Sequence, residues 1–168
     1  IETYFIVVKF SLEDFYEIPN MTIVSNPSLI NIHSSENFPG FNVLMYHGFS
    51  FPYYADNVPS ITEKGGIFKC ELIMKFLLQR RHLAPSHSST LYVPDGEFDP
   101  LVVREIPDIF VSGHIHQITV GNYRNVSMII HPAVKTKNVT PRRYVRNIIK
   151  ENKRSNKFVE RFFSFLTM

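Results

Sequence analysis

Apolar and polar residues alternate along several short segments of this chain, with the period of two that is typical of β-strands. The clearest alternation covers residues 29–33, where isoleucines on one face alternate with leucine and polar residues on the other. The apolar run 41–46 follows a polar loop, so we predict that these two segments form a hairpin. Further strands are predicted at residues 4–10, 21–24, 101–103, 108–112, 117–123 and 126–130, the last two as a second hairpin.

A period near 3.6 residues distinguishes residues 67–81, which form the clearest predicted helix. Pro85 prevents its continuation, and Arg80 and Arg81 in the last turn suit the negative end of the helix dipole. A short helix is also predicted to begin at the capping segment 11–14. Residues 49–60 are rich in aromatic residues and proline without a clear period, and this pattern favours an ordered loop.

The composition changes after residue 133. Residues 135–161 hold ten lysines and arginines against two glutamates, with apolar residues at near-helical spacing between them. We therefore divide the chain into residues 1–133 and a basic, helical tail, residues 134–168. Three interpretations stay open: a solvated tail, a contact with the phosphate backbone of DNA, or a helix that docks on a partner. The basic residues considered for such a contact are Arg142, Arg143 and Arg146.

Length, charge and cysteine content limit the class of protein. A chain of 168 residues with 44% apolar residues is long enough for one domain with a core, and its net charge of +3 does not by itself indicate nucleic-acid binding. The single cysteine, Cys70, excludes an intrachain disulfide and fits a reducing cytosol. No apolar run approaches the ~20 residues that span a bilayer, so we expect a cytoplasmic protein without membrane contact. The chain begins with Ile1 rather than Met, and we interpret it as a fragment.

Histidines follow two of the predicted strands. His114 and His116 come after the strand 108–112 and Gly113, while His47 closes the strand 41–46 and precedes Gly48. If these strands lie side by side, their carboxyl ends meet, where open α/β sheets place their sites. Neutral imidazoles are common metal ligands, so the three histidines are candidate metal ligands. The alternative is a His-x-His in a solvated loop.

Three segments carry a resemblance to a known family. They are Tyr46-His47-Gly48-x-Ser50, then Leu78-Gln79-Arg80-Arg81-His82-Leu83-Ala84-Pro85, and then Glu105-Ile106-Pro107-Asp108-Ile109 running into Gly113-His114-Ile115-His116. In this order they resemble the small subunit of archaeal family-D DNA polymerases, which belongs to the calcineurin-like metallophosphoesterases. The similarity covers roughly residues 15 to 130, and Arg-Arg-His-Leu-Ala-Pro is far more specific than Gly-His-x-His.

The resemblance implies a fold, a site and partners. It implies an α/β fold, a partial calcineurin-like β-sandwich flanked by helices, of which residues 1–133 are the C-terminal half. It further implies a two-metal site, with manganese as the expected ion, and a metal-dependent 3′→5′ exonuclease of archaeal DNA replication beside a large catalytic subunit. His47 and His114 would bind one ion and His116 the other. Arg80 and Arg81 would contact DNA or the partner subunit.

The chain departs from the family's pattern at its carboxylates. The family's Asp-x-His, its metal-bridging Asp and its Gly-Asn-His-Asp are absent. Bridging carboxylates hold two cations close together, so we expect at most one ion in this chain alone and assign no catalytic residue. Two explanations compete: a split or truncated subunit whose separate N-terminal half supplies the carboxylates, or an inactive scaffold that binds the large subunit. A basic DNA-binding domain is a third, weaker hypothesis.

Overall fold

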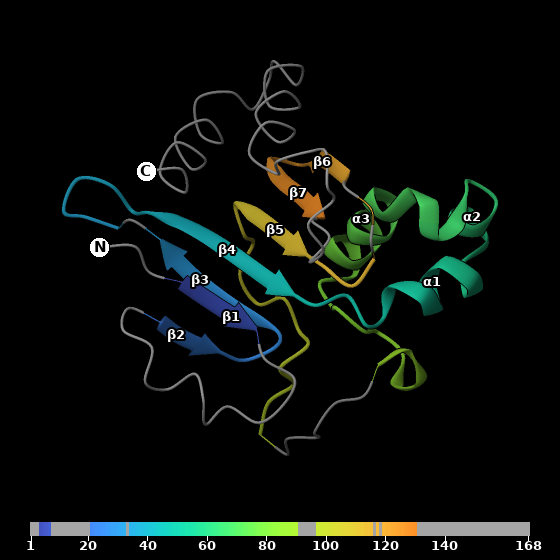
Figure 1. The fold of residues 1–168 in the computed structure, drawn as a ribbon, viewed down its shortest axis with the longest axis horizontal. Helices are drawn as coiled ribbons and strands as arrows, with labels where there is room; N and C mark the ends of the chain where they lie inside the picture. The colour runs from blue at the N-terminus through green and yellow to red at the C-terminus, as the bar shows by residue number, and fades with distance from the viewer. Residues whose placement is uncertain are drawn as a thin grey trace.

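The computed structural model describes residues 4–7, 21–32, 34–90, 97–115, 117 and 119–130 (Figure 1). Its centre is a five-stranded mixed sheet with the strand order β3-β4-β5-β7-β6. The three central strands β4, β5 and β7 run parallel, and the outer strands β3 and β6 are antiparallel to their neighbours. The strands are β3 (Ser28–Ile32), β4 (Phe41–Tyr46), β5 (Ile109–Ser112), β6 (Thr119–Tyr123) and β7 (Val126–Ile130). A separate two-stranded parallel sheet pairs β1 (Tyr4–Val7) with β2 (Met21–Val24).

Both predicted hairpins are confirmed. Strands β3 and β4 pair antiparallel, and β3 alternates half-buried and exposed residues as its sequence pattern predicts. Strands β6 and β7 are joined by Arg124 and Asn125, which both have positive φ, 47° and 69°. Two consecutive residues in this conformation are typical of the tight turn whose twist matches that of the two strands.

Three helices lie together beside the sheet (Figure 1). They are α1 (Phe51–Asn57), α2 (Pro59–Thr62) and α3 (Cys70–Arg80), with 3₁₀ turns at Gly66–Lys69 and His87–Ser89. The prediction for α3 is confirmed, with the 3₁₀ turn in place of its first residues. The loop expected at residues 49–60 is wrong, because α1 and α2 occupy it. Each of these short helices has a proline in its first turn, where the missing N–H costs nothing.

The strand expected at residues 101–103 is also wrong. This segment makes an isolated bridge between Val102 and His82 instead of joining the sheet. The N–H of Leu83 donates to the carbonyl of Leu101, and the N–H of Val103 donates to the carbonyl of Arg81. The segment therefore pairs with the chain that leaves α3, and not with another strand.

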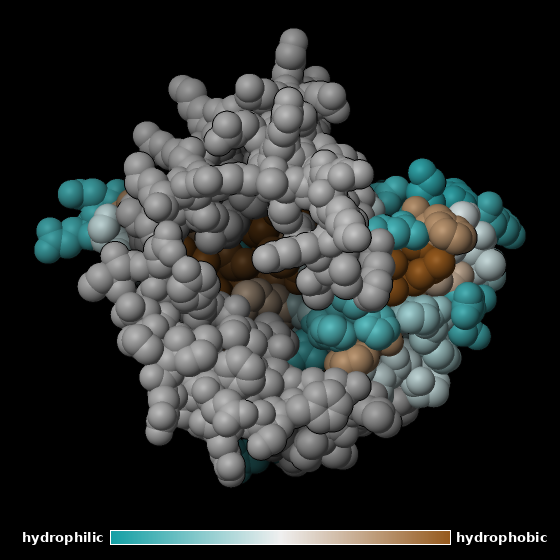
Figure 2. All heavy atoms as spheres, in the orientation of Figure 1, coloured by the Kyte–Doolittle hydropathy of each residue, from teal (hydrophilic) through white to brown (hydrophobic). Residues whose placement is uncertain are grey.

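The sheet carries apolar side chains on both faces. On one face, residues of β4, β5 and β7 pack with the helices in a large cluster that includes Phe110, Met128 and Ile130. On the other face, Phe41, Val43, Ile109 and Ile129 form a second buried cluster. Figure 2 shows hydrophilic residues at both ends of the long axis, over the β3–β4 connection and over the end near α2.

Several predictions fall outside the residues that the structure describes. These are the short helix after Ser11, residues 8–10 of the first strand, His116, and the tail of residues 134–168 with Arg142, Arg143 and Arg146. Within the described part of the chain, no helix has the length and apolar character that crossing a membrane requires.

Candidate functional site

The two histidines that follow neighbouring strands lie together in the folded chain. Strands β4 and β5 are parallel and adjacent, and their last residues, Tyr46 and Ser112, are register partners. His47 follows the first and His114 lies two residues beyond the second, so both reach the same edge of the sheet. The expectation that the carboxyl ends of these strands meet is confirmed.

Hydrogen bonds hold the backbone of His47 from two sides. Its N–H donates to the side-chain oxygen of Asn26 over 2.8 Å. Its carbonyl accepts from the N–H of Gly113 and from the hydroxyl of Ser112, each over 3.3 Å. These bonds fix the end of β4 to the end of β5 and to the turn before β3.

The residues next to the histidines adopt backbone conformations that bring the two strand ends close together. Gly48 has φ +100°, and a Cβ atom at this position would lie 2.7 Å from the hydroxyl oxygen of Ser112. Only glycine fits such a close approach without a shift of its neighbour. His114 itself has φ 51°, which is uncommon for a residue with a side chain.

The two imidazoles meet at 3.1 Å between Nε2 of His47 and Nδ1 of His114. With metal–nitrogen bonds of about 2.0–2.1 Å, two nitrogens on one ion lie roughly 2.8–3.4 Å apart for angles between 90° and tetrahedral. The observed separation therefore fits two ligands of one cation. It equally suits a hydrogen bond in which one neutral imidazole donates to the other.

An aromatic ring covers this pair. The ring of Phe49 lies 4.3 Å from that of His47 and 5.3 Å from that of His114, measured between centroids. His47 is half-buried, whereas His114 is exposed. One side of the pair is thus walled by an apolar ring, which excludes water from that side.

The described residues include two of the three histidines that the sequence predicts as metal ligands. No group of three or more His, Cys, Asp and Glu side chains able to hold a metal occurs among them. His116 lies outside the described residues, so its predicted role as a ligand stays a prediction. Sequence reasoning missed two residues that shape the site, Asn26 and Ser112. Ser112 is a sequence neighbour of the motifs, whereas nothing in the sequence indicates that Asn26 reaches His47.

The arginines at the end of α3 have different surroundings. Arg81 ends the helix with φ 56°, and its guanidinium donates to the carbonyls of Val103, over 2.7 Å, and of Arg104. Arg80 is exposed, with its guanidinium over the ring of Phe76 at 4.7 Å. The Arg81 side chain thus joins two parts of the backbone, and the contact with DNA or a partner stays a prediction for both arginines.

Both ring nitrogens of His82 contact neighbouring segments. Its Nε2 lies 2.9 Å from a carboxylate oxygen of Asp99, and its Nδ1 accepts from the N–H of Ala84. Slight burial raises the pKa of Asp99, but hydrogen bonds from the Leu101 N–H and His82, with the charges of His82 and Arg104, bring it below its usual range. This pair fixes the segment after α3 to the segment before β5.

Cys70 is fully buried at the start of α3. Burial, followed by the charge of Glu71, raises the pKa of its thiol to about 11. A thiol that stays protonated is a poor nucleophile and metal ligand, and Cys70 packs in the core cluster beside the helices.

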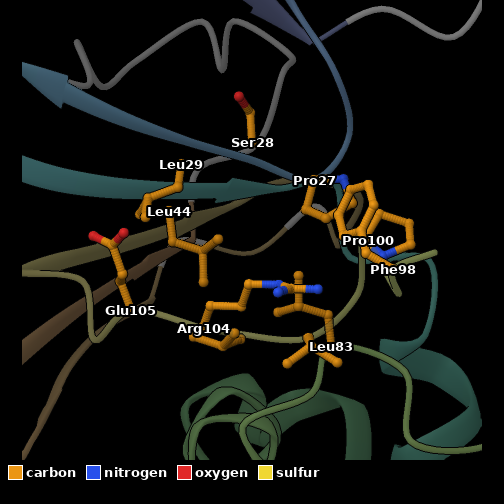
Figure 3. Close-up of a pocket in the computed structure, with 11 residues that line it drawn as sticks. Pro27, Ser28, Leu29, Leu44, Leu83, Phe98, Pro100, Arg104 and Glu105 are labelled. Carbon is orange, nitrogen blue, oxygen red and sulfur yellow. The ribbon is translucent and has the colours of Figure 1, made fainter.

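Two hollows lie away from the histidines. The smaller, about 190 Å³, lies between β3, β4 and the segment of residues 98–105. Figure 3 shows Leu44 and Leu83 approaching it from opposite sides, with Phe98 and Pro100 near Pro27. The larger, about 570 Å³, lies at the end of α3 and beside the β6–β7 turn.

Comparisons with known proteins agree with the resemblance that the motifs carry. No protein-family model matches the chain. The chain is 32% identical over 117 residues to the DNA polymerase II small subunit of Methanothermobacter thermautotrophicus, which is 70% of this chain and 22% of that protein. It is 32% identical over 118 residues to that of Thermoplasma acidophilum and 35% identical over 111 residues to that of Archaeoglobus fulgidus.

The matched part of the chain is much smaller than these proteins. It corresponds to about a fifth of the length of the curated relatives, 22% and 20% in the first and last of the three. The same kind of protein recurs in several archaea at similar identity, over about two thirds of this chain or more. The chain is therefore related to the small subunits of archaeal DNA polymerase II, and the resemblance predicted from its motifs is confirmed.

Proposed function

We propose that the chain is part of a DNA polymerase small subunit that acts in DNA replication, with a large catalytic subunit as its partner. The support is the similarity to three archaeal proteins of that name, over about two thirds of this chain or more. A mixed sheet whose two faces both carry buried apolar clusters supports the more specific proposal of a calcineurin-like sandwich.

Within that subunit, we propose that His47 and His114 bind one divalent cation, with manganese as the expected ion. The observation that carries this proposal is the 3.1 Å between Nε2 of His47 and Nδ1 of His114 at the end of two parallel strands. Two imidazoles leave coordination positions open, which His116, water or carboxylates from another segment would occupy.

A complete site of this kind would hydrolyse phosphodiesters. Metal ions neutralise phosphate charge and lower the pKa of bound water, which is the chemistry of phosphodiester hydrolysis. The resemblance to the family extends this proposal to a 3′→5′ exonuclease. The contribution of this chain would be the imidazole side of the site, while carboxylates from a separate N-terminal half would complete it. The chain alone is then expected to bind a metal ion but not to cleave DNA.

The test measures manganese binding by isothermal titration calorimetry on the 168-residue chain. We expect one site in the wild-type protein, and we expect binding to be lost in His47→Ala and in His114→Ala, because a single imidazole is a weak ligand. His82→Gln is the matched control, since it removes an imidazole that contacts Asp99 and leaves His47 and His114 unchanged. Equal binding by wild type and both site variants would reject the proposal, as would no binding even after addition of an N-terminal half.

A specific observation favours a second candidate function, an inactive scaffold that binds the large subunit. The family's carboxylate motifs are absent from the sequence, and the described residues hold no group of three metal ligands. In this case the chain co-purifies with a large polymerase subunit, and His47→Ala leaves the affinity for that subunit unchanged. Loss of the complex in His47→Ala would contradict the scaffold.

A further inference from the structure

The hollow of about 570 Å³ lies at the amino-terminal ends of the parallel strands, opposite to the ends that the histidines follow. Pro107, just before β5, and Val126, the first residue of β7, contribute to its wall, and both belong to the amino-terminal ends of these parallel strands. The histidines follow the carboxyl ends of β4 and β5, and a four-residue strand separates the two edges by roughly 13 Å. An inference about this hollow is therefore independent of the proposed metal site.

The charged side chains among the described residues that line the hollow are all positive. Arg80, Arg81 and Arg124 line it, and no acidic side chain is among the described residues that do. Arg81 is held by two backbone carbonyls, so its position on the rim is fixed. Arg80 and Arg124 are exposed, and neither takes part in the ion pair found in the described part of the chain, between His82 and Asp99. Two exposed cations, Arg80 and Arg124, and the fixed cation Arg81 thus line the same hollow.

Part of the wall between these cations is aliphatic. Leu78, Val103 and Val126 form buried parts of it, and Ile106 stands at its rim with 65% of its surface exposed. An isolated exposed isoleucine is ordinary, but one beside a hollow with an apolar wall gives a binding partner apolar surface to bury. The combination of an apolar centre and an arginine rim is typical of protein interfaces.

The aromatic rings near the hollow already have cations over them. The ring of Tyr123 has the Lys75 ammonium over it at 5.4 Å and the Arg124 guanidinium at 5.5 Å. The ring of Phe76, on α3 nearby, has Arg80 over it. Single-stranded nucleic acid binds by stacking bases on open aromatic faces, and the rings beside this hollow already have cations over them. These features favour a peptide over nucleic acid.

We propose that this hollow binds an acidic peptide segment of a protein partner, with one aliphatic side chain against Ile106 and carboxylates on Arg80 and Arg124. The carboxylates form charge-assisted hydrogen bonds with the guanidinium groups, and the aliphatic side chain is buried on the wall. Arg81 keeps its backbone contacts and adds positive potential without moving.

The test uses fluorescence anisotropy with a rhodamine-labelled peptide, Gly-Asp-Glu-Leu-Glu-Asp-Gly, and the 168-residue chain. We expect saturable binding in the micromolar range. Binding weakens about tenfold in Arg80→Gln and in Arg124→Gln, because each loses a charge-assisted contact. Ile106→Ser weakens binding several-fold, as does replacing the peptide's leucine by serine.

Lys64→Gln is the matched control, because it removes an exposed cation outside the hollow, and it changes the affinity by less than about twofold. Thermal unfolding followed by circular dichroism shows that each variant is folded. The proposal is overturned if the peptide does not saturate up to about 1 mM, or if Lys64→Gln has the same effect as the arginine variants. It is also overturned if a single-stranded oligonucleotide binds at these arginines while the peptide does not.

Discussion

At the scale of single residues, backbone conformation next to the histidines determines where the imidazoles lie. Gly48 and His114 both have positive φ, 100° and 51°. A residue with a side chain in this region carries a cost of order 1–3 kcal/mol, and such residues cluster where geometry serves a function. The strain at His114 accompanies an imidazole placed 3.1 Å from its neighbour.

Replacing Gly48 by alanine tests this close approach. The new Cβ would lie 2.7 Å from the Ser112 hydroxyl oxygen, in a backbone conformation unfavourable for alanine. We expect Gly48→Ala to lower the free energy of unfolding by about 2–4 kcal/mol, measured by urea denaturation. Gly65→Ala is the control, because Gly65 has φ +116° but its added Cβ would meet only the flexible Lys69 side chain. A larger loss in Gly65→Ala than in Gly48→Ala would contradict this explanation.

At the scale of elements, one residue, Asp108, joins the three parallel strands where they begin. The side-chain carboxylate of Asp108 accepts a hydrogen bond from the backbone N–H of Asn42, over 2.8 Å. Its N–H donates to the Asn42 carbonyl, and its carbonyl accepts from the N–H of Ser127. The residue before β5 is thus bound to β4 on one side and to β7 on the other.

Removing this carboxylate should weaken the register of the sheet. We expect Asp108→Ala to cost about 1–3 kcal/mol of unfolding free energy, because the half-buried N–H of Asn42 loses its charged acceptor. Asp108→Asn keeps an oxygen at this position and should cost less. Hydrogen exchange of the Asn42 amide measures the local effect. Equal destabilisation by both substitutions would show that the hydrogen bond is not the cause.

Elements whose pattern repeats were predicted well from the sequence, and elements fixed by distant contacts were not. Strands β3 and β6 and helix α3 carry their own period, and β4, β5 and β7 are short, mostly apolar runs, so their existence follows from local sequence. Helices α1 and α2 have seven and four residues, too few for a period to appear. The run 101–103 has β-branched residues but pairs with the chain after α3, and no local signal reveals the partner of a strand.

The same distinction holds for the site. His47 and His114 were found because each follows an apolar strand and adjoins a glycine, and the parallel pairing then brings them together. Asn26 was missed because it lies 21 residues before His47 and reaches it only in the folded chain. Residues that bind a backbone group from afar have no spacing by which to recognise them.

At the scale of the whole molecule, the two apolar clusters share their strands. Phe110 of β5 packs against the helices, whereas its neighbour Ile109 belongs to the cluster on the other face. Strands β4 and β7 are shared in the same way. Loss of one face therefore removes support from the other, and the described part of the chain should unfold as one unit.

Truncation of Phe110 tests this cooperativity. The side chain is fully buried, so Phe110→Ala should cost about 3–5 kcal/mol, a large part of the stability of a domain. Denaturation followed by the circular dichroism of the helices and hydrogen exchange of the β3–β4 amides should report the same fall in the free energy of unfolding. Separate transitions for the helices and the β3–β4 hairpin would show that the faces are independent.

The pair of imidazoles has a further consequence through its distance along the chain. His47 and His114 are 67 positions apart. Any cross-link between them, covalent or through an ion, would close a ring that includes all three helices. In the chain-entropy description, a cross-link that closes a ring of that length lowers the entropy of the unfolded chain. This stabilises the folded state by about 4 kcal/mol. A ligand bound to both histidines would therefore tie the two ends of this segment together. Its release would lower the stability of the whole segment between β4 and β5.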